Sequence, residues 1–278
     1  MSASSIRLPA HESRTKIRLM AQHNPSIREE ALALLRRGVT NRAVAEHLNV
    51  PRGTVGWWLH EDRKQRGVKY TQPTDCPICT GRDFDRIAYA YLLGLYLGDG
   101  HIISKPKQHH LSIFCGDAWP GLIIEAEAAM RQVMPAPRTG RRQRSGCVEV
   151  KSFTKHWTCV FPQHGPGKKH ERRIALEPWQ QEIVDAHPRD FVRGLIHSDG
   201  CRNMNWTTRI VGGERKRYEY PRYWFTNVSD DIRQLYTDTL DELGVEWKHC
   251  TRAGNKYNIS VARRASVALM DAHVGPKH

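Results

Sequence analysis

The sequence has no apolar run that approaches the roughly 18 residues needed to cross a bilayer. Its first residues include Ser, Arg and His, and they lack the apolar core of a secretory signal peptide. We therefore expect a protein that makes no membrane contact and stays in the cytoplasm.

A disulfide framework is also missing, because the seven cysteines are scattered and odd in number, which favours a reduced compartment. Cys76 and Cys79 flank Pro77-Ile78, a spacing typical of half a zinc site. No second pair with this spacing occurs among the other five cysteines. Zn²⁺ at Cys76 and Cys79 is therefore a hypothesis that needs ligands from distant parts of the chain.

Acidic residues are few relative to basic ones, with 29 Asp and Glu against 43 Lys and Arg. The formal net charge is +14 and the pI is about 9.7, so a polyanion is the expected partner. The alternative is that the basic charge serves only to keep the protein soluble. A hydrophobic content of 39% over 278 residues supports a proper core and leaves room for two compact units.

An apolar segment that ends in Asp-Gly occurs twice, one hundred residues apart. The copies are Leu92-Leu93-Gly94-Leu95-Tyr96-Leu97-Gly98-Asp99-Gly100 and Val192-Arg193-Gly194-Leu195-Ile196-His197-Ser198-Asp199-Gly200. Glycine inside a helix costs about 1 kcal/mol relative to alanine and needs a packing reason. The small residues lie on one helical face in each copy, so two such helices can pack backbone to backbone.

Each copy ends in an aspartate at the carboxy-terminal turn, where the helix dipole disfavours a negative charge. Asp99 and Asp199 would then lie side by side and would favour a divalent cation. An ordinary Asp-Gly turn explains one copy, but the same placement of Gly-Leu ahead of both indicates function.

Both copies resemble the signature of the LAGLIDADG family, whose members include homing endonucleases, intein endonuclease domains and a few transcription regulators. The resemblance covers about residues 86–278. It implies an α+β fold of two αββαββα repeats, 86–187 and 188–278, with the signature helices packed at a pseudo-twofold axis in a monomer. Two four-stranded sheets would form a saddle over the major groove of double-stranded DNA, which accepts two-stranded ribbons.

The internal repeat extends beyond the signatures. Strand-like runs at 111–117 and 225–230 each precede a helical pattern, which ends near Met134 and Leu243 respectively. Alternating runs follow at 148–153 and 257–262, and then the His-Gly-Pro-rich segments 164–170 and 273–278.

The resemblance also implies the site residues. Asp99 and Asp199 match the metal-binding acids, one for each DNA strand, and the carbonyl oxygens of Gly98 and Ser198 are further candidate ligands of Mg²⁺. Such a cation suits phosphodiester cleavage, which needs an activated water and charge neutralisation. A lysine from each repeat is expected near the scissile phosphate. By position these are Lys169 and Lys277, with Lys168 a near alternative and surface phosphate contact the simpler reading.

The amino-terminal part is expected to be a basic flexible tail over 1–23 followed by a helix-turn-helix domain over 24–66. Helical patterns cover 27–36, 40–47 with Thr40 as a cap, and 51–62 with Pro51 at its first position. Residues 37–55 resemble the helix-turn-helix of bacterial regulators. Residues 67–85, which contain the Cys pair, are expected to be a linker.

The helix-turn-helix resemblance implies that Arg52 and Thr54 lie near the start of the helix that enters the major groove, and that Arg42 meets phosphate. A three-helix bundle used for protein contact is the alternative. Trp57 and Trp58 are expected to pack in the core rather than to read bases.

Two basic runs are expected in loops between strands, where they would contact phosphates and make binding salt-dependent. Solvated loops would look the same in sequence. The runs are Arg138, Arg141, Arg142 and Arg144 in the first repeat and Arg215, Lys216 and Arg217 in the second. The spacing of His156, His164, His170, His197 and His273 fits neither a helical metal pair nor an HNH nuclease.

The sequence therefore predicts a Mg²⁺-dependent, site-specific endonuclease of double-stranded DNA that is cytoplasmic and associated with the nucleoid. The alternative is a non-cleaving helix-turn-helix transcription regulator on the same scaffold. In such regulators the acids are usually degraded, whereas both acids are present here.

Overall fold

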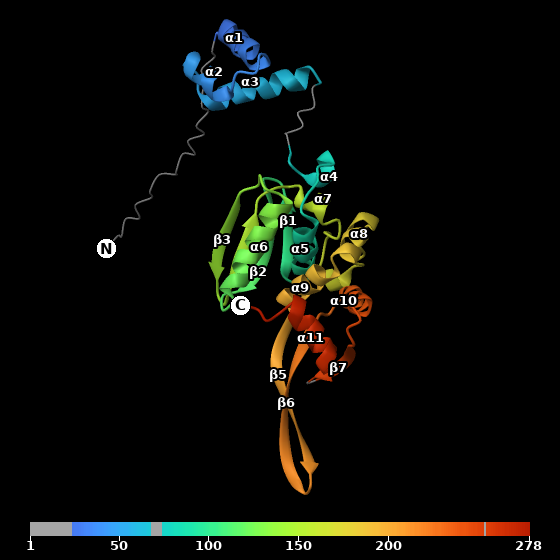
Figure 1. Cartoon of the computed structure of the whole chain (residues 1–278). Helices are drawn as coiled ribbons and strands as arrows, with labels where there is room; N and C mark the ends of the chain where they lie inside the picture. Colours follow the sequence, from blue (N-terminus) through green and yellow to red (C-terminus); the bar gives the residue numbers. More distant parts are fainter. Residues whose placement is uncertain (1–23, 68–73, 253) are drawn as a thin grey trace, which may run out of the picture. The chain divides into compact units, whose positions relative to one another are not determined.

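The computed structural model describes residues 24–67, 74–252 and 254–278, and the expected tail over 1–23 lies outside them. The chain divides after Pro73 into two compact units (Figure 1). Within the described residues, no helix has the length and apolar character needed to span a bilayer.

The first unit is built from three helices, α1 (Pro25–Arg36), α2 (Asn41–His47) and α3 (Arg52–Gln65). The Thr40 side chain accepts a hydrogen bond from the Ala43 amide, so the predicted cap of α2 is confirmed. Pro51 occupies the N-cap position of α3 and does not begin the helix as expected. The buried apolar residues are Ala31, Val44, Ala45, Val50, Val55 and Trp58.

The two tryptophans of α3 differ. Trp58 is 5% exposed and packs in the core as predicted, but Trp57 is 50% exposed, so the expectation that Trp57 packs inside is wrong. Neighbouring helix positions point about 100° apart, and only one of the pair faces α1 and α2. Asp62 on α3 forms ion pairs with Arg36 and Arg66, which ties the end of α3 to α1.

The second unit begins at Thr74, so the expected linker over 67–85 is wrong for residues 74–85. These residues include a short helix, α4 (Pro77–Thr80), and Cys76 is fully buried. Helix α4 packs against α7 (Trp157–Val160), as Figure 1 also shows. The Pro, Thr and Asp content that favoured a linker is overridden by this tertiary packing.

The predicted order αββαββα occurs twice, which confirms the duplication. The first copy is α5 (Arg86–Asp99), β1 (Gly100–Lys105), β2 (Gln108–Gly116), α6 (Pro120–Val133), β3 (Thr139–Arg144), β4 (Cys147–Ser152) and α7. The second is α9 (Pro188–Asp199), β5 (Gly200–Val211), β6 (Glu214–Thr226), α10 (Asp230–Glu242), β7 (Lys248–Arg252), β8 (Asn255–Val261) and α11 (Arg264–His273). After α7, and still within the first repeat (86–187), lie a 3₁₀ turn, η1 (Lys169–Glu171), and the unpredicted helix α8 (Pro178–Ala186).

Each copy contributes one antiparallel sheet, with the strand orders β1-β2-β4-β3 and β5-β6-β8-β7. The registers are equivalent, because Gly100 pairs with Ile113 in the first sheet and Gly200 pairs with Phe225 in the second. One face of each sheet packs against helices and the other is open, since adjacent strand residues point to opposite faces.

Helices α5 and α9 pack directly against each other through their glycines. A Cβ on Gly94 would lie 2.5 Å from the carbonyl oxygen of Phe191 and 2.7 Å from the amide nitrogen of Leu195. A Cβ on Gly194 would likewise meet the carbonyl oxygen of Tyr91. The close approach predicted from the small residues is therefore present, and it holds the carboxy-terminal ends of the two helices together.

The hairpin of β5 and β6 is much longer than its counterpart in the first copy. The strands pair from Gly200 with Phe225 to Val211 with Glu214, and the hairpin extends beyond the rest of the second unit (Figure 1). The counterpart hairpin of β1 and β2 pairs only from Gly100 to Lys105.

Candidate functional site

The site begins at the ends of α5 and α9, because each helix ends at its aspartate and a strand starts at the following glycine. Packing of the two helices brings Asp99 and Asp199 together. A Cβ on Gly98 would lie 3.0 Å from Oδ2 of Asp199. The two carboxylates therefore share one small space at the negative ends of two helix dipoles.

Both carboxyls are hard to ionise in this space. Burial raises the pKa of Asp99 to about 6, and the charge of Asp199 adds to this effect, while Lys277 and Lys169 oppose it. Burial also raises the pKa of Asp199, against a hydrogen bond from Asn227. A buried negative charge that its neighbours compensate only in part is the condition that a bound cation relieves.

Asn227 is a site residue that the sequence analysis missed. Its Nδ2 donates to Oδ2 of Asp199 over 2.5 Å. The equivalent registers of the two sheets match Asn227 with Cys115 in the first copy. Cys115 is buried, and among the described residues no hydrogen-bond donor reaches the Asp99 carboxylate. The two acids are thus held differently, and only the alignment of the two repeats by strand register could have indicated this.

Each predicted lysine binds the end of the signature helix from its own repeat. Nζ of Lys169 donates to the carbonyl oxygens of Tyr96, Leu97 (3.0 Å) and Gly98 (2.9 Å), and Nζ of Lys277 donates to that of Ser198 (2.9 Å). Both ammonium groups therefore lie where the two helix dipoles are most negative.

Both lysines are partly buried, and this lowers their pKa values. Burial lowers the pKa of Lys169 to about 8, although the two aspartates oppose the shift, and burial lowers the pKa of Lys277 as well. Lys168, the near alternative, is exposed, and its Nζ lies 3.4 Å from Glu171. Lys169 is thus the lysine of this segment that binds the end of α5 beside the acids.

The carbonyl oxygens of Gly98 and Ser198, which were the additional candidate metal ligands, accept the lysine hydrogen bonds. A carbonyl oxygen has two lone pairs, so each can accept from a lysine and still offer one to a cation.

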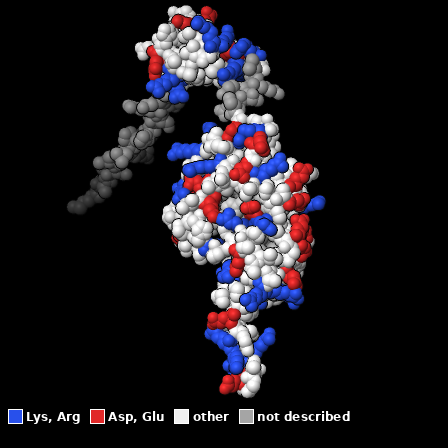
Figure 2. Space-filling view, viewed as in Figure 1, with Lys and Arg blue, Asp and Glu red and all other residues white. Residues whose placement is uncertain are grey.

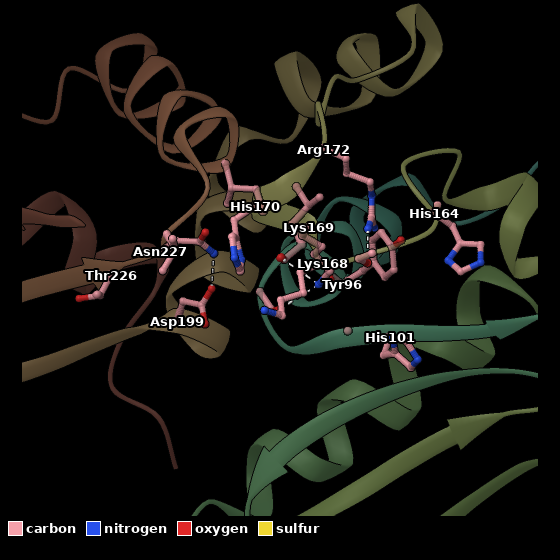
Figure 3. Close-up of a pocket in the computed structure, with 17 residues that line it drawn as sticks. Tyr96, His101, His164, Lys168, Lys169, His170, Arg172, Asp199, Thr226 and Asn227 are labelled. Carbon is pink, nitrogen blue, oxygen red and sulfur yellow. Dashed lines mark hydrogen bonds between the residues drawn. The ribbon is translucent and has the colours of Figure 1, made fainter. Parts of the chain in front are cut away.

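A cleft of about 500 Å³ opens beside the helix ends (Figure 3). Tyr96 lies in its wall, stacks on Phe161 with 4.3 Å between ring centroids, and holds Nζ of Lys169 at 4.9 Å from its own ring. The lining includes Tyr96, Gly98, His101, His164, Lys168, Lys169, His170, Arg172, Asp199 and Asn227. The cleft therefore combines the Asp199 carboxylate with several cationic or neutral donors, which suits an anionic ligand.

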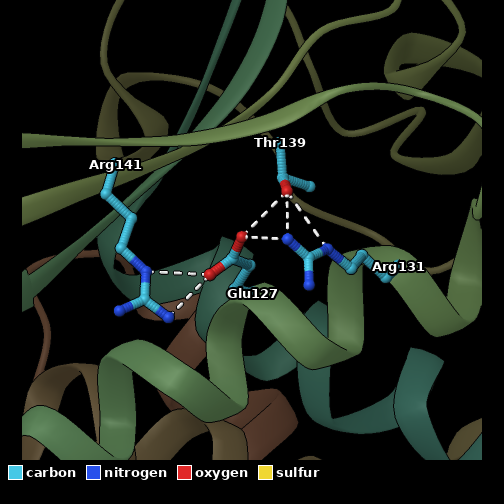
Figure 4. Close-up of polar contacts among 4 residues, drawn as sticks. All are labelled: Glu127, Arg131, Thr139 and Arg141. Atoms are coloured by element: carbon cyan, nitrogen blue, oxygen red, sulfur yellow. Dashed lines mark hydrogen bonds and ion pairs between the residues drawn. The ribbon is translucent and has the colours of Figure 1, made fainter.

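Arg138 precedes strand β3, but Arg141, Arg142 and Arg144 lie in the strand, so the expected position of these three in a loop is wrong. Strand alternation sends Arg141 toward α6, where Glu127 binds it with 2.7 Å between Arg141 Nη2 and Glu127 Oε2. Arg131 and Thr139 complete this cluster (Figure 4). Arg141 therefore stabilises the packing of β3 on α6 and is not positioned to contact a ligand on the open face.

Arg142 and Arg144 lie on the open face of the same sheet. Arg144 pairs with the buried Glu149 at 3.2 Å, while Arg142 is exposed. Lys151 is on this face too, with Nζ 3.1 Å from Oε1 of Glu149.

The second basic run lies in strand β6, again not in a loop. Lys216 is on the open face, whereas Arg215 and Arg217 are on the opposite face, and Arg217 pairs with Glu219 at 2.6 Å. Basic side chains gather along this hairpin in Figure 2.

The open face of the second sheet forms a groove of about 740 Å³. Arg222 lies in it between two aromatic rings, 5.3 Å from the centroid of Tyr220 and 4.9 Å from that of Trp224. Arg222 was not predicted from the sequence because it is not part of a basic run. The groove lining includes Thr207, Arg209, Tyr218, Tyr220, Arg222, Trp247, Lys248 and Arg263.

The predicted contacts of the first unit lie on its surface. Arg42 is exposed and pairs with Glu46 at 2.8 Å. Arg52 is exposed at the start of α3, and Thr54, two residues later, is half-buried. Cys76 and Cys79, the candidate zinc ligands, lie at α4 in the second unit and do not line the cleft.

Comparisons with known proteins give structural likenesses only, because no protein-family model and no curated protein matches the chain. The homing endonuclease I-DmoI in complex with DNA and Mn is 14% identical, with a TM-score of 0.46 over 69% of this chain and 98% of that one. The homing endonuclease I-WcaI bound to its DNA recognition sequence is 13% identical, with a TM-score of 0.44 over 78% and 86%. Full-length DUF199/WhiA from Thermatoga maritima is 11% identical, with a TM-score of 0.43 over 69% and 56%.

Proposed function

We propose that this chain is a metal-dependent endonuclease that cuts double-stranded DNA at a specific site. The observation that carries the proposal is the duplicated pair of an aspartate and a lysine at the ends of α5 and α9. A structural role does not account for it, because two buried acids at negative helix ends destabilise the fold.

The donor set at the helix ends fits a hard divalent cation. Asp99 and Asp199 offer carboxylate oxygens, and the carbonyl oxygens of Gly98 and Ser198 each retain a lone pair. These four residues would hold Mg²⁺, which prefers such oxygen ligands. When bound, the metal supplies an activated water and neutralises negative charge on the phosphate.

The protein residues have roles of their own in this proposal. Lys169 and Lys277 place a positive charge beside each acid, where it stabilises charge that develops on phosphate oxygens. A pKa of about 8 lets Lys169 exchange a proton with water near neutral pH. Asn227 holds one oxygen of Asp199 and so orients this carboxylate.

Two active centres in one chain suit a duplex, since each strand has its own scissile phosphate. One Asp–Lys pair comes from each repeat, so the chain needs no second copy to complete the site. We therefore propose that it acts as a monomer.

The open faces of the two sheets would position the DNA. Arg142 and Lys151 lie on the first face, and Lys216 and Arg222 lie on the second. Basic side chains contact phosphates, and a two-stranded ribbon such as the β5–β6 hairpin fits the major groove.

The three helices of the first unit would add a second DNA contact as a helix-turn-helix domain. In this arrangement α3 enters the major groove, with Arg52 and Thr54 near its start. Arg42 would exchange its exposed ion pair with Glu46 for a phosphate, an exchange that costs little because surface ion pairs are weak.

The proposal is tested by selecting duplexes that the full chain binds and then adding Mg²⁺ or a chelator. We expect cuts at a defined position with Mg²⁺ and none with the chelator. The double variant Asp99→Asn/Asp199→Asn should bind the selected duplex without cutting it. Asp238→Asn, an exposed acid on α10, is the matched control and should cut normally. Specific binding without cleavage by the wild-type chain would refute the nuclease and identify a non-cleaving DNA-binding protein.

A further inference from the structure

Four residues with metal-binding side chains come together where α4 meets α7. They are Cys76, Cys79, His156 and Cys159, and their ligand atoms all lie within 4.8 Å of one another. Sγ of Cys79 is 3.4 Å from Nδ1 of His156 and 3.7 Å from Sγ of Cys159, and Sγ of Cys159 is 3.8 Å from Nδ1 of His156.

The three distances among Cys79, His156 and Cys159 match the edges of a tetrahedral zinc site. Zinc binds sulfur at about 2.3 Å and imidazole nitrogen at about 2.0–2.1 Å, so tetrahedral edges are about 3.8 Å between two sulfurs and about 3.6 Å between sulfur and nitrogen. A disulfide would bring two sulfurs to about 2.05 Å. Cys76, Cys79 and Cys159 form no disulfide, so all three are thiols.

The two halves of the cluster are built alike, although they lie far apart in the sequence. Cys76 and His156 are the N-cap residues of α4 and α7, and Cys79 and Cys159 follow three residues later. A threonine two residues earlier accepts a hydrogen bond from each first ligand's amide, Thr74 at 3.0 Å and Thr154 at 3.3 Å. Both loops are thus shaped in the same way to present two ligands each.

We propose that Cys76, Cys79, His156 and Cys159 form a structural zinc site. The thiolates favour zinc over magnesium, so this metal is distinct from the one proposed at Asp99 and Asp199. Four protein ligands leave no open position for water or substrate, which is the arrangement of a structural and not a catalytic zinc. The inference does not depend on the proposed nuclease activity.

The site explains how α4 keeps its place. A helix of four residues is not stable alone, because helix nucleation is unfavourable and few hydrogen bonds repay it. Zinc would fasten α4 to α7 at the point where the chain enters its second compact unit. The first signature helix, α5, starts a few residues later at Arg86, so the metal also fixes the segment that leads into it.

The first test is the metal content of the full chain, purified under reducing conditions without a polyhistidine tag. We expect one zinc per chain by mass spectrometry. Replacement of the zinc by Co²⁺ should give the absorption bands of tetrahedral cobalt with thiolate ligands. Removal by a chelator should lower the melting temperature reversibly, and re-addition of Zn²⁺ should restore it.

Variants identify the ligands. Cys79→Ser and Cys159→Ser should each weaken zinc affinity at least tenfold and shift the cobalt spectrum, whereas Cys201→Ser and Cys250→Ser are matched controls that should do neither. Circular dichroism in excess Zn²⁺ shows whether a variant has folded, and the wild-type titration does not depend on any variant. A reduced chain that binds neither zinc nor cobalt tightly would overturn the proposal. So would unchanged affinity in Cys159→Ser, or a disulfide between Cys79 and Cys159 found by mass spectrometry.

Discussion

The substitution Asp99→Asn should stabilise the metal-free protein at neutral pH while it removes a residue of the proposed active site. Burial first, and then the charge of Asp199, raise the pKa of Asp99 from 3.8 to about 6. The folded state therefore disfavours the charged carboxylate. Asparagine has nearly the same shape and carries no charge at any pH.

The size of the effect follows from the pKa shift. Each unit corresponds to about 1.4 kcal/mol, so a shift of about two units gives an upper value of about 3 kcal/mol. Because the folded pKa is raised, the native carboxyl keeps its proton to a higher pH than the unfolded one does. The destabilisation is therefore absent below the unfolded pKa of 3.8 and fully developed above the folded pKa of about 6.

Urea denaturation of both proteins across this pH range, in the presence of a chelator, measures the difference in unfolding free energy. We expect the advantage of Asp99→Asn to grow as the pH rises and to shrink when Mg²⁺ is present. Asp238→Asn is the control, since this acid is exposed and its replacement should change little at any pH. A variant that is less stable than the wild type at pH 7, or an advantage that does not vary with pH, would refute the reasoning.

Three further predictions concern the helix interface, an ion-pair cluster and the groove. Gly94→Ala gains about 1 kcal/mol of helix propensity, but its Cβ lies 0.9 Å inside the 3.4 Å limit of ordinary contact with the Phe191 oxygen. Overpacking commonly costs about 1–3 kcal/mol, so the net change should be a loss of up to about 2 kcal/mol, and a melting temperature above that of the wild type would contradict this packing. Glu127→Gln should cost about 1–3 kcal/mol at neutral pH. Burial raises the pKa of Glu127, but hydrogen bonds from Thr139 and Arg141 and the charges of Arg141 and Arg131 outweigh it and hold the pKa below 4.5. In urea denaturation this loss should therefore fade as the pH falls below 4.5, and a loss equal at all pH values would count against the ion pairs. Arg222→Ala should weaken binding to a non-specific duplex and reduce its salt dependence by about one phosphate contact, whereas Arg217→Ala on the opposite face should do neither. Equal effects of the two variants in filter binding would show that DNA does not bind preferentially to the open face.

The sequence predicted the architecture because the duplication is visible in it. Two Asp-Gly endings one hundred residues apart, with small residues at matching helical positions, indicate two like helices that touch. Lys169 and Lys277 were predicted in the same way, because they occupy equivalent positions in the two repeats. Information that recurs along a chain at a fixed spacing is what a single sequence reveals best.

The parts that escaped prediction depend on contacts between distant segments or on strand geometry. Arg141 and Arg142 look alike in sequence, yet strand alternation sends one toward Glu127 and the other to the open face. The cysteine pair at α4 finds its partners 77 and 80 residues away, at a distance that no spacing rule covers. Asn227 reaches Asp199 only because β6 pairs with β5 in one particular register.

In the proposed function, Asp99 and Asp199 each support the cleavage of one DNA strand. The most direct measurement follows both strands of a selected duplex, labelled separately, during cleavage in Mg²⁺ by the wild type, Asp99→Asn and Asp199→Asn. We expect the wild type to cut both strands. Each single variant should nick only one strand, and the strand left intact should differ between Asp99→Asn and Asp199→Asn. Cleavage of both strands at the wild-type rate by either variant would contradict the proposed function.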